Sequence, residues 1–385
     1  MIVTAIISEY NPLHDGHRYH IEETRRITEC DRLIVIMSGS FTQRGEPAIF
    51  SKWSRAEAAV RAGADLVLEL PATYAAAGAE RFAFGAVSVL NGLDLVNFLS
   101  FGSESGDVEY LRRLGTFFAD ESPAYQSALK QLLDRGVSFP SAREQAAAVL
   151  LGTDLSSLSL PNDALAVEYI KSLIRTGSAI TPVAIKRRGS AYNSTDIAGQ
   201  FPSALAIRTA MENGMSGAPY SKETPVFAAS MFPAVQWALR SASAQYLCGI
   251  AEVSEGLEHR LLSSCATAHS YAELIGSVKS KRYTMARVKR IVANVFLGIT
   301  KELNRTIDAA PLYARVLAVK KESSDLLSLL SKTSRIPVVT SPKHTTHPGL
   351  LLDIHATDMR SCLLHPSLPS GLDYTTPLLV TESVL

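Results

Sequence analysis

The stretch SEYNPLHDGHRYH, residues 8–20, follows the run IVTAIIS, residues 2–8. Short apolar runs rich in Val, Ile and Thr are typical of buried strands, so residues 2–8 predict the first strand of a sheet. The residues after the stretch mix apolar and charged side chains in a composition typical of a helix. The stretch therefore lies in a strand-to-helix turn, which is where an α/β sheet places its ligand.

The same alternation of strand and helix continues beyond the first turn. We predict strands at residues 2–8, 32–39, 65–71, 95–102 and 179–189, with helical segments between them. Such alternation indicates parallel strands joined by right-handed crossovers. The expected fold class is therefore α/β, with a doubly wound parallel sheet as a Rossmann-like core.

The chain divides into an α/β part, residues 1–215, and a mainly helical C-terminal part, residues 216–385. Within the first part, residues 106–151 have helical spacing and are predicted to leave the sheet as a helical excursion. The second part is helical in pattern over residues 226–331. A short strand and loops are expected from residue 335 onwards.

Length and composition narrow the class of protein. At 385 residues the chain is long enough for two or three domains, and its net charge of +1 means that any contact with nucleic acid requires a local patch. We expect a cytoplasmic protein without a membrane span, because no signal peptide fits and the most apolar window, residues 81–102, is interrupted by polar residues. Scattered cysteines predict reduced thiols and no disulfide framework: Cys30, Cys248, Cys265 and Cys362.

His14 and His17 flank a glycine in the first turn. Gly16 lacks the Cβ that would keep a ligand from the backbone, and a helix start offers unpaired N–H groups and a partial positive charge. Such a site favours an anion such as phosphate. Two imidazoles beside it can donate hydrogen bonds to phosphoryl oxygens as their charge develops.

Two other interpretations of these histidines stay open. His14, His17 and His20 are spaced by three residues and could hold a metal ion, but His14 and His20 would lie about 120° apart on a helix. That angle makes a metal triad the weaker alternative, and we predict no metal site. The remaining alternative is that the histidines are capping or surface side chains without a function.

Further polar residues follow later strands and are expected at the same edge of the sheet. The alternative for each residue, taken singly, is a solvated loop, a helix cap or a surface ion pair. Arginine suits phosphate because its planar group binds two oxygens at once. The candidates are Gln43, Arg44, Glu46, Lys52 and Arg55 after the second strand, Gly102 after the fourth, Asn162 before a helix, and Lys186, Arg187, Arg188, Ser203 and Arg208 late in the core.

His14-Asp15-Gly16-His17, together with Ser203-Ala204-Leu205-Ala206-Ile207-Arg208, resembles the paired H-x-G-H and S-x-x-x-I-R signature of the nucleotidyltransferase superfamily. Over most of the chain the sequence resembles, more closely, the bacterial tRNA(Met) cytidine acetate ligase family. The stretches that carry this likeness are SEYNPLHDGHRYH (8–20), MSGSFTQRGEPAIFSKWSRAEAAVRAGADLVLELP (37–71), FGSES (101–105), PNDALAVEYIK (161–171) and IKRRG (185–189). The likeness extends more weakly through SKRYTMARVKRIVANVFLGITK (280–301) and ARVLAVKK (314–321).

The resemblance implies a nucleotidyltransferase-like ATP-binding domain in residues 1–215 and an ATP-dependent ligase. Acetate and ATP would give acetyl-adenylate and pyrophosphate, and the N4 amine of the wobble cytidine in elongator tRNA(Met) would take the acetyl group. Acetate is already ionised at neutral pH and needs no general base. Positioning and neutralisation of phosphate charge would then be the protein's main tasks, with Mg²⁺ bridging phosphate oxygens.

Carried over by position, the resemblance assigns catalytic roles to His14, His17 and Arg208. It assigns ATP binding to Ile7, Glu9, Tyr10, Asn11, Pro12, Gly16, His17, His20, Gly102, Asn162, Arg187 and Ser203. The second motif departs from the superfamily pattern at two places, because Pro202 and Leu205 stand where hydroxyl residues are common.

The tRNA would need a surface of its own. The segment SVKSKRYTMARVKRIVANVFLGITK, residues 277–301, predicts a helix with apolar side chains inward and a basic outer face that can follow a phosphate backbone. Tyr283 could stack on an unpaired base. The candidate tRNA-binding residues are Lys281, Arg282, Tyr283, Arg287 and Arg290, and the alternative is an ordinary solvated helix face.

Two other functions compete with the ligase. The first is a small-molecule adenylyltransferase, whose nucleophile is a metabolite phosphate; the long basic C-terminal part counts against it. The second is a non-catalytic RNA-binding protein on an inactive nucleotide fold. Four intact phosphate-compatible residues weigh against that function: His14, Gly16, His17 and Arg208. The oligomeric state stays open.

Overall fold

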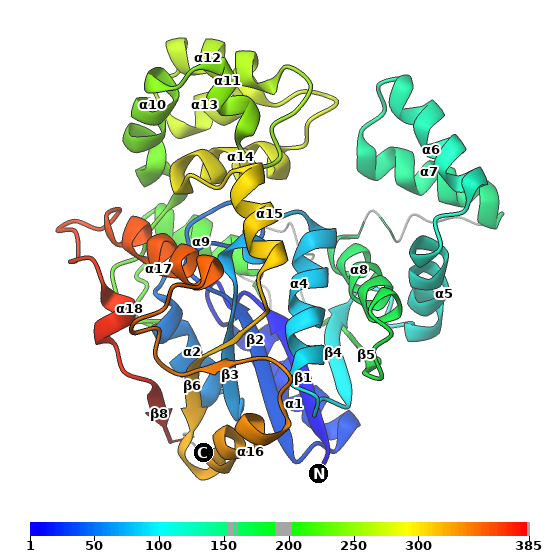
Figure 1. Ribbon diagram of the computed structural model, residues 1–385, viewed down its shortest axis with the longest axis vertical. Helices are drawn as coiled ribbons and strands as arrows, with labels where there is room; N and C mark the ends of the chain where they lie inside the picture. Colours follow the sequence, from blue (N-terminus) through cyan, green and yellow to red (C-terminus); the bar gives the residue numbers. More distant parts are fainter. Residues whose placement is uncertain (153–157, 159, 189–201, 383–385) are drawn as a thin grey trace.

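The computed structural model describes residues 1–152, 158, 160–188 and 202–382. Its centre is one sheet with the strand order β5-β4-β1-β2-β3-β6-β7, and β8 pairs with β6 beside β7 (Figure 1). The strands are β1 (Val3–Ser8), β2 (Arg32–Ser38), β3 (Leu66–Leu70), β4 (Phe98–Ser103), β5 (Thr181–Lys186), β6 (Ala314–Lys320), β7 (Val338–Val339) and β8 (Leu379–Thr381).

The first five strands are parallel, which confirms the predicted doubly wound core. The chain runs from β1 outward through β2 and β3, then returns to place β4 and β5 on the other side of β1. The strand order therefore reverses between β1 and β4, and a ligand of such a sheet binds at the carboxyl ends of these strands. The predicted fifth strand ends within the described residues at Lys186, and Gly189, its expected last residue, lies outside them.

Both faces of the sheet are covered, because neighbouring residues of a strand point to opposite sides. In β2, Ile34 and Ile36 pack with the core that includes α4 and α8, whereas Val35 and Met37 pack with the core beneath α1 and α2. The helices of this half are α1 (Asp15–Thr28), α2 (Lys52–Arg61), α3 (Ala72–Ala75), α4 (Ala79–Gly92), α5 (Val108–Ala119), α6 (Pro123–Asp134), α7 (Phe139–Leu151), α8 (Pro161–Arg175) and α9 (Ala204–Glu212).

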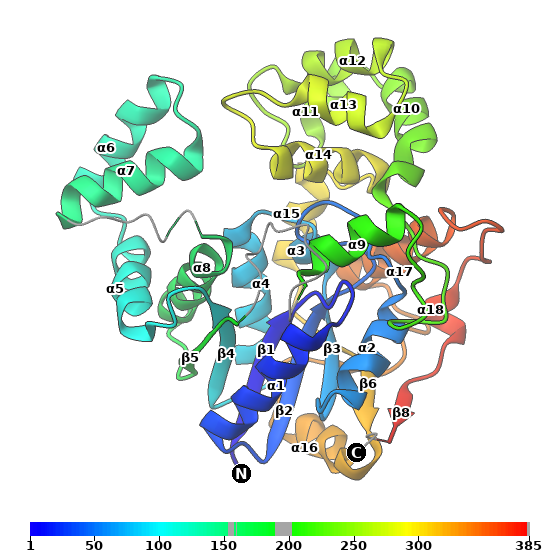
Figure 2. The same ribbon diagram turned by 180° about the vertical axis from the view of Figure 1, so that it is seen from behind.

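Helices α5, α6 and α7 form the predicted excursion from the sheet. Helix α5 packs against α8, and α6 and α7 extend away from the sheet as an arm (Figures 1 and 2). The arm faces the C-terminal helices across a gap in both views. The C-terminal half contributes α10 (Phe232–Ser241), α11 (Ala244–Gly249), α12 (Leu257–Thr267), α13 (Tyr271–Val278), α14 (Met285–Leu297), α15 (Lys301–Ala309), α16 (Asp325–Thr333), α17 (Pro348–Ser361) and α18 (Leu372–Thr375).

Two expectations for the C-terminal half are wrong. Residues 314–320, expected to be helical, form β6, which pairs antiparallel with β3 and is buried on both faces. A short apolar run buried on both sides has no period that separates strand from helix. Residues 348–361, expected to be loops, form helix α17, with Pro348 at its first position and His347 as its N-cap. The C-terminal half thus completes the sheet as well as forming a helical layer.

The helical layer has its own apolar core, which is continuous with the first half. Phe41, from the loop after β2, packs at 6.0 Å between ring centroids against Phe296 of α14. Among the described residues no helix is long and apolar enough to cross a membrane. All four cysteines are free thiols, as predicted.

Candidate nucleotide-binding active site

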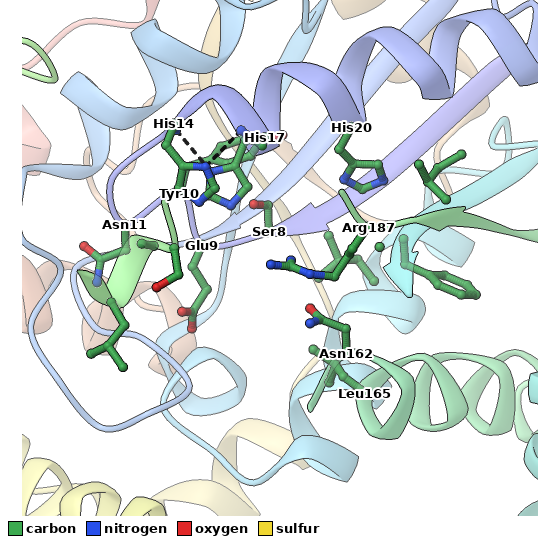
Figure 3. A pocket seen from close by; sticks show the side chains of 18 of the residues that line it. Ser8, Glu9, Tyr10, Asn11, His14, His17, His20, Asn162, Leu165 and Arg187 are labelled. Atoms are coloured by element: carbon green, nitrogen blue, oxygen red, sulfur yellow. Dashed lines mark hydrogen bonds between the residues drawn. The ribbon is translucent and has the colours of Figure 1, made fainter. Parts of the chain in front are cut away.

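His14 is the N-cap of α1 and builds the turn that follows β1. Its Nδ1 accepts a hydrogen bond from the Gly16 N–H at 3.1 Å, and the His17 Nδ1 accepts one from the His14 N–H at 3.3 Å. The two rings stack at 3.8 Å between centroids (Figure 3). A Cβ on residue 16 would lie 2.9 Å from the His14 Cε1, so glycine is required there by the position of the ring.

These hydrogen bonds assign the tautomer of both histidines. Because each Nδ1 accepts an N–H, each neutral ring carries its proton on Nε2. Burial, together with Arg187 and Arg208, lowers the pKa of His14 to about 4, and burial lowers the pKa of His17 well below its ordinary value. At neutral pH both imidazoles are therefore uncharged donors.

His20 lies one turn further along α1 and faces β4. Its Nε2 lies 3.1 Å from the Ser100 Oγ, and burial lowers its pKa to about 4. The described residues contain no group of three His, Cys, Asp or Glu side chains that could hold a metal ion. His20 thus lies beside the pocket as a neutral polar group.

Arg208 connects the S-x-x-x-I-R motif of α9 with the turn that carries the H-x-G-H motif. Ser203 caps α9 by accepting a hydrogen bond from the Ala206 N–H at 3.0 Å, and the Arg208 Nη1 donates to the Asn11 carbonyl at 2.7 Å. The Asn11 Oδ1 in turn accepts the Ile49 N–H at 2.7 Å. Two helix starts that lie far apart in the sequence therefore face one cavity.

Glu9 is the carboxylate that lines this cavity, and it is partly buried. Its Oε1 accepts the Gln43 N–H at 2.7 Å. Burial raises the pKa of Glu9, and this effect exceeds the opposing influence of the Gln43 hydrogen bond and of Arg208, Arg44 and Arg55. Glu9 thus joins the end of β1 to the loop after β2.

Asn162 is held by the loop after β4. Its side-chain amide donates to the Glu104 Oε1 at 2.6 Å, while Asp163 accepts the Glu104 N–H at 2.9 Å. Asn162 is the second residue of α8 and not its cap, since Leu160 occupies that position. The reciprocal hydrogen bonds fix Asn162 below Arg187, whose guanidinium points toward the middle of the pocket (Figure 3).

The cavity collects nearly all of the residues predicted for ATP. Of the predicted catalytic and ATP-binding residues, Pro12 does not line the cavity. The thirteen others do: Ile7, Glu9, Tyr10, Asn11, His14, Gly16, His17, His20, Gly102, Asn162, Arg187, Ser203 and Arg208. Gln43, Arg44, Lys186 and Arg188 line it too, and Arg188 lies 4.9 Å above the ring of Tyr19. Leu165 and Tyr169 form a wall that was not predicted. Their helical spacing from Asn162 was the available signal.

Lys52 and Arg55 were expected to face this cavity, and that expectation is wrong. The Lys52 Nζ is fully buried between Glu69 and Asp373, both at 2.8 Å. Arg55 donates to the carbonyls of Glu9, Ser38, Gly39 and Phe50. Arg55 therefore joins the carboxyl ends of β1 and β2, because a buried guanidinium must satisfy its donors.

The basic segment predicted for tRNA differs from expectation at two residues. Tyr283 is buried, with its hydroxyl 3.1 Å from the Glu255 Oε2 and Arg287 5.3 Å above its ring, so its faces are not open to a base. The Arg290 side chain is 11% exposed and pairs with Glu252 at 2.7 Å. Lys281 and Arg282 are exposed in the loop before α14.

Comparisons with known proteins agree with this geometry. Residues 1–371 match the family model HIGH Nucleotidyl Transferase. The tRNA(Met) cytidine acetate ligase of Thermoanaerobacter sp. (strain X514) is 37% identical over 98% of this chain and 100% of its own, and that of Clostridium perfringens is 39% identical over 97% and 98%. Crystal structures of Thermotoga maritima TmcAL, apo and bound with alpha-thio ATP, superpose with TM-scores of 0.93 and 0.89 at 32% and 31% identity over both whole chains.

The doubly wound sheet, the two neutral imidazoles at the start of α1 and the arginine from α9 define a nucleotidyltransferase of the H-x-G-H type. Full-length similarity then narrows the class. The chain belongs to the HIGH nucleotidyltransferase family and, within it, to the tRNA(Met) cytidine acetate ligases.

Proposed function

We propose that this protein activates acetate with ATP and transfers the acetyl group to N4 of the wobble cytidine of elongator tRNA(Met). One observation carries the first step: the starts of α1 and α9 face one cavity, with His14, His17 and Arg208 at its edge. A site with neutral imidazole donors and guanidinium groups matches the charge of a triphosphate. The tRNA substrate would place this reaction in the cytoplasm.

In the first step an acetate oxygen attacks the α-phosphorus of ATP. The new O–P bond forms as the bond to the β-phosphate oxygen breaks, and pyrophosphate leaves with the electron pair. The Nε2–H groups of His14 and His17 and the guanidinium of Arg208 would stabilise the developing charge. Because the imidazoles are uncharged, they donate hydrogen bonds without adding the desolvation cost of two buried cations.

In the second step the cytidine N4 attacks the acetyl carbonyl. The C–N bond forms, the C–O bond to the adenylate breaks, AMP leaves with the electron pair and N4 loses one proton. Mg²⁺ commonly binds substrate phosphates with few protein ligands, and Glu9 is the carboxylate that lines this cavity. Mg²⁺ would thus be held mainly by phosphate oxygens, with Glu9 as the available protein ligand.

The experiment that tests the proposal follows the nucleoside product. The protein is incubated with ATP, acetate and an elongator tRNA(Met) transcript, and a transcript with uridine at the wobble position serves as the control. We expect AMP, pyrophosphate and a cytidine that gains one acetyl group, with no acetylated nucleoside from the control.

Two other results would contradict the proposal in different ways. Acetate-dependent ATP turnover without a modified nucleoside would move the acceptor to a small molecule. No turnover with or without tRNA would favour a non-catalytic RNA-binding protein.

A further inference from the structure

A second cavity, of about 1130 Å³, lies between the arm and the C-terminal helices. Its walls come from α4 and α8, from α6 and α7 of the arm, and from α14 and α15. Gln43 lines this cavity and also the nucleotide cavity. The loop that follows β2 therefore borders both cavities at Gln43.

That loop is held firmly on both sides. Toward the nucleotide cavity, the Gln43 N–H donates to Glu9 at 2.7 Å. Toward the C-terminal helices, a Cβ on Gly45 would lie 2.5 Å from the Arg290 Cα, and Glu46 pairs with Lys289 at 2.5 Å. Gly45 has φ 73°, a conformation that glycine adopts without strain. The loop that lies between the two cavities is thus fixed by both halves of the fold.

The charge of the second cavity suits an uncharged ligand group. Its described lining has similar numbers of basic and acidic side chains: Arg81, Arg143, Lys171, Arg175, Arg290 and Lys301 against Glu80, Glu121, Glu144, Glu168 and Glu252. The basic groups are occupied by protein partners, as where Lys171 pairs with Glu80 at 2.6 Å. A row of phosphates would have to compete with these ion pairs, whereas a nucleobase would not.

Two aromatic side chains in this cavity are open to solvent. Phe84 of α4 is 45% exposed and Phe139 at the start of α7 is 53% exposed. Exposed aromatic rings are the usual stacking surfaces for unpaired bases. The loop before α14, with Lys281 and Arg282 on it, projects toward α6 and α7 in both views and can take the flanking phosphates (Figures 1 and 2).

We propose that this cavity receives the acceptor RNA as unpaired nucleobases stacked on Phe84 and Phe139, and that the acceptor base reaches the adenylate past Gln43. The inference rests on the proposed function and deepens it by naming where the acceptor enters. The arm thereby becomes part of the RNA site. This role accounts for helices α6 and α7, which extend away from the sheet (Figures 1 and 2).

The test uses the full-length double variant Phe84→Ala/Phe139→Ala with an elongator tRNA(Met) transcript. We expect kcat/KM for the tRNA to fall about tenfold or more, since base stacking on aromatic side chains is a large part of single-strand binding. Hydroxylamine-trapped acetyl-adenylate formation should change less than about twofold, because neither ring lines the nucleotide cavity. Trp237→Ala is the control, since Trp237 is 73% exposed on α10 and lines neither cavity.

The outcomes separate the two claims. The cavity proposal alone is overturned if the wild-type protein acetylates cytidine and the double variant keeps its kcat/KM for tRNA. It is also overturned if the double variant loses adenylate formation to the same extent as tRNA acetylation. A wild-type protein that forms acetyl-adenylate but modifies no RNA overturns the proposed function and this inference with it. A transcript with 4-thiouridine at the wobble position gives a second readout: cross-links to α4, α7 or α14 support the proposal, and cross-links confined to α10–α13 contradict it.

Discussion

The nucleotide cavity and the basic segment 279–290 both contain clustered cations, yet the two regions use them differently. Arg187 and Arg208 line an open cavity beside uncharged imidazoles. In the basic segment, Arg290 pairs with Glu252, and Arg287 donates to the Glu252 carbonyl and the Ser254 Oγ. Basic residues that cluster in a sequence therefore do not by themselves indicate an anion site, because the tertiary fold decides which of them pair with carboxylates.

The largest effect should follow from His17→Ala. This change removes one Nε2–H donor from the phosphate site, so acetate-dependent pyrophosphate release should fall about 100-fold or more. Helix α1 keeps its His14 cap, and unfolding by circular dichroism should stay cooperative. Full activity in a folded variant would show that His17 takes no part in the mechanism. The donors of the nucleotide cavity would then not differ from those of the basic segment in acting on a ligand.

A smaller effect should follow from Gly16→Ala, which keeps both imidazoles but moves one. The new Cβ would lie 2.9 Å from the His14 Cε1 and would displace the stacked ring. We expect KM for ATP to rise about tenfold, measured by pyrophosphate release at varied ATP.

Gly276→Ala in α13 is the matched control for that variant, because a Cβ at residue 276 meets nothing within 4 Å and Gly276 does not line the nucleotide cavity. Its KM for ATP should equal that of the wild type. If the Gly16→Ala variant bound ATP like the wild type, the position of the His14 ring would not matter for the nucleotide.

The basic segment offers a prediction of moderate size that divides its residues into two groups. Arg290→Ala leaves Glu252 without its partner and should lower the free energy of unfolding by about 1–3 kcal/mol, with little change in tRNA affinity. The double variant Lys281→Ala/Arg282→Ala should unfold normally but bind tRNA about threefold more weakly at low salt, with a reduced salt slope. Urea unfolding and filter binding at several salt concentrations check both statements. Equal loss of tRNA affinity in the two variants would show that Arg290 contributes its charge to RNA binding and not only to the ion pair with Glu252.

These two regions also show what sequence could predict. The turn at His14–His17 was predictable because an N-cap is a local structure: the residues that satisfy the first N–H groups lie within three positions of one another. The burial of Tyr283 and Arg290 was not predictable from the sequence. It depends on contacts with Glu252, Glu255 and the backbone of Gly45, which only the tertiary fold brings next to the basic segment. Spacing alone does not tell which face of a basic helix is already occupied.

The buried ion pairs illustrate the same limit. Lys52 and Arg55 look like solvated or ligand-binding groups in the sequence, but Glu69, Asp373 and four carbonyl groups satisfy them in the core. Strand β6 was missed for a related reason, because its partner β3 comes from the first part of the chain. In both cases the deciding contact is far away in the sequence.

The smallest effect concerns pH. The folded-state pKa values of His14 and His20 are about 4, below the value near 6.5 of an unfolded chain, so the unfolded state binds more protons between these values. The stability linked to these histidines is complete above about pH 6.5 and is lost as pH falls toward 4. The histidines should cause no change in acetyl-adenylate formation between about pH 6.5 and 8, because they stay neutral there.

Urea unfolding at a series of pH values measures how stability falls between pH 6.5 and 4. The fall should be less steep in the His20→Asn variant. Hydroxylamine trapping of the adenylate, between pH 6.5 and 8, measures whether the rate of acetyl-adenylate formation stays constant. A rate that changes with a midpoint near pH 6.5 and loses that midpoint in the His17→Ala background would show that an imidazole titrates in the working site.

The measurement that tests the central claim most directly follows the oxygen of acetate. The protein is supplied with ATP, tRNA and acetate labelled with ¹⁸O in both oxygens, and the AMP and pyrophosphate are analysed by mass spectrometry. If the acetate oxygen attacks the α-phosphorus and stays with the phosphate when the acetyl group leaves, each AMP carries one ¹⁸O atom and the pyrophosphate carries none. Unlabelled AMP would show that acetate is not activated as the adenylate, and it would contradict the function assigned to the cavity of His14, His17 and Arg208.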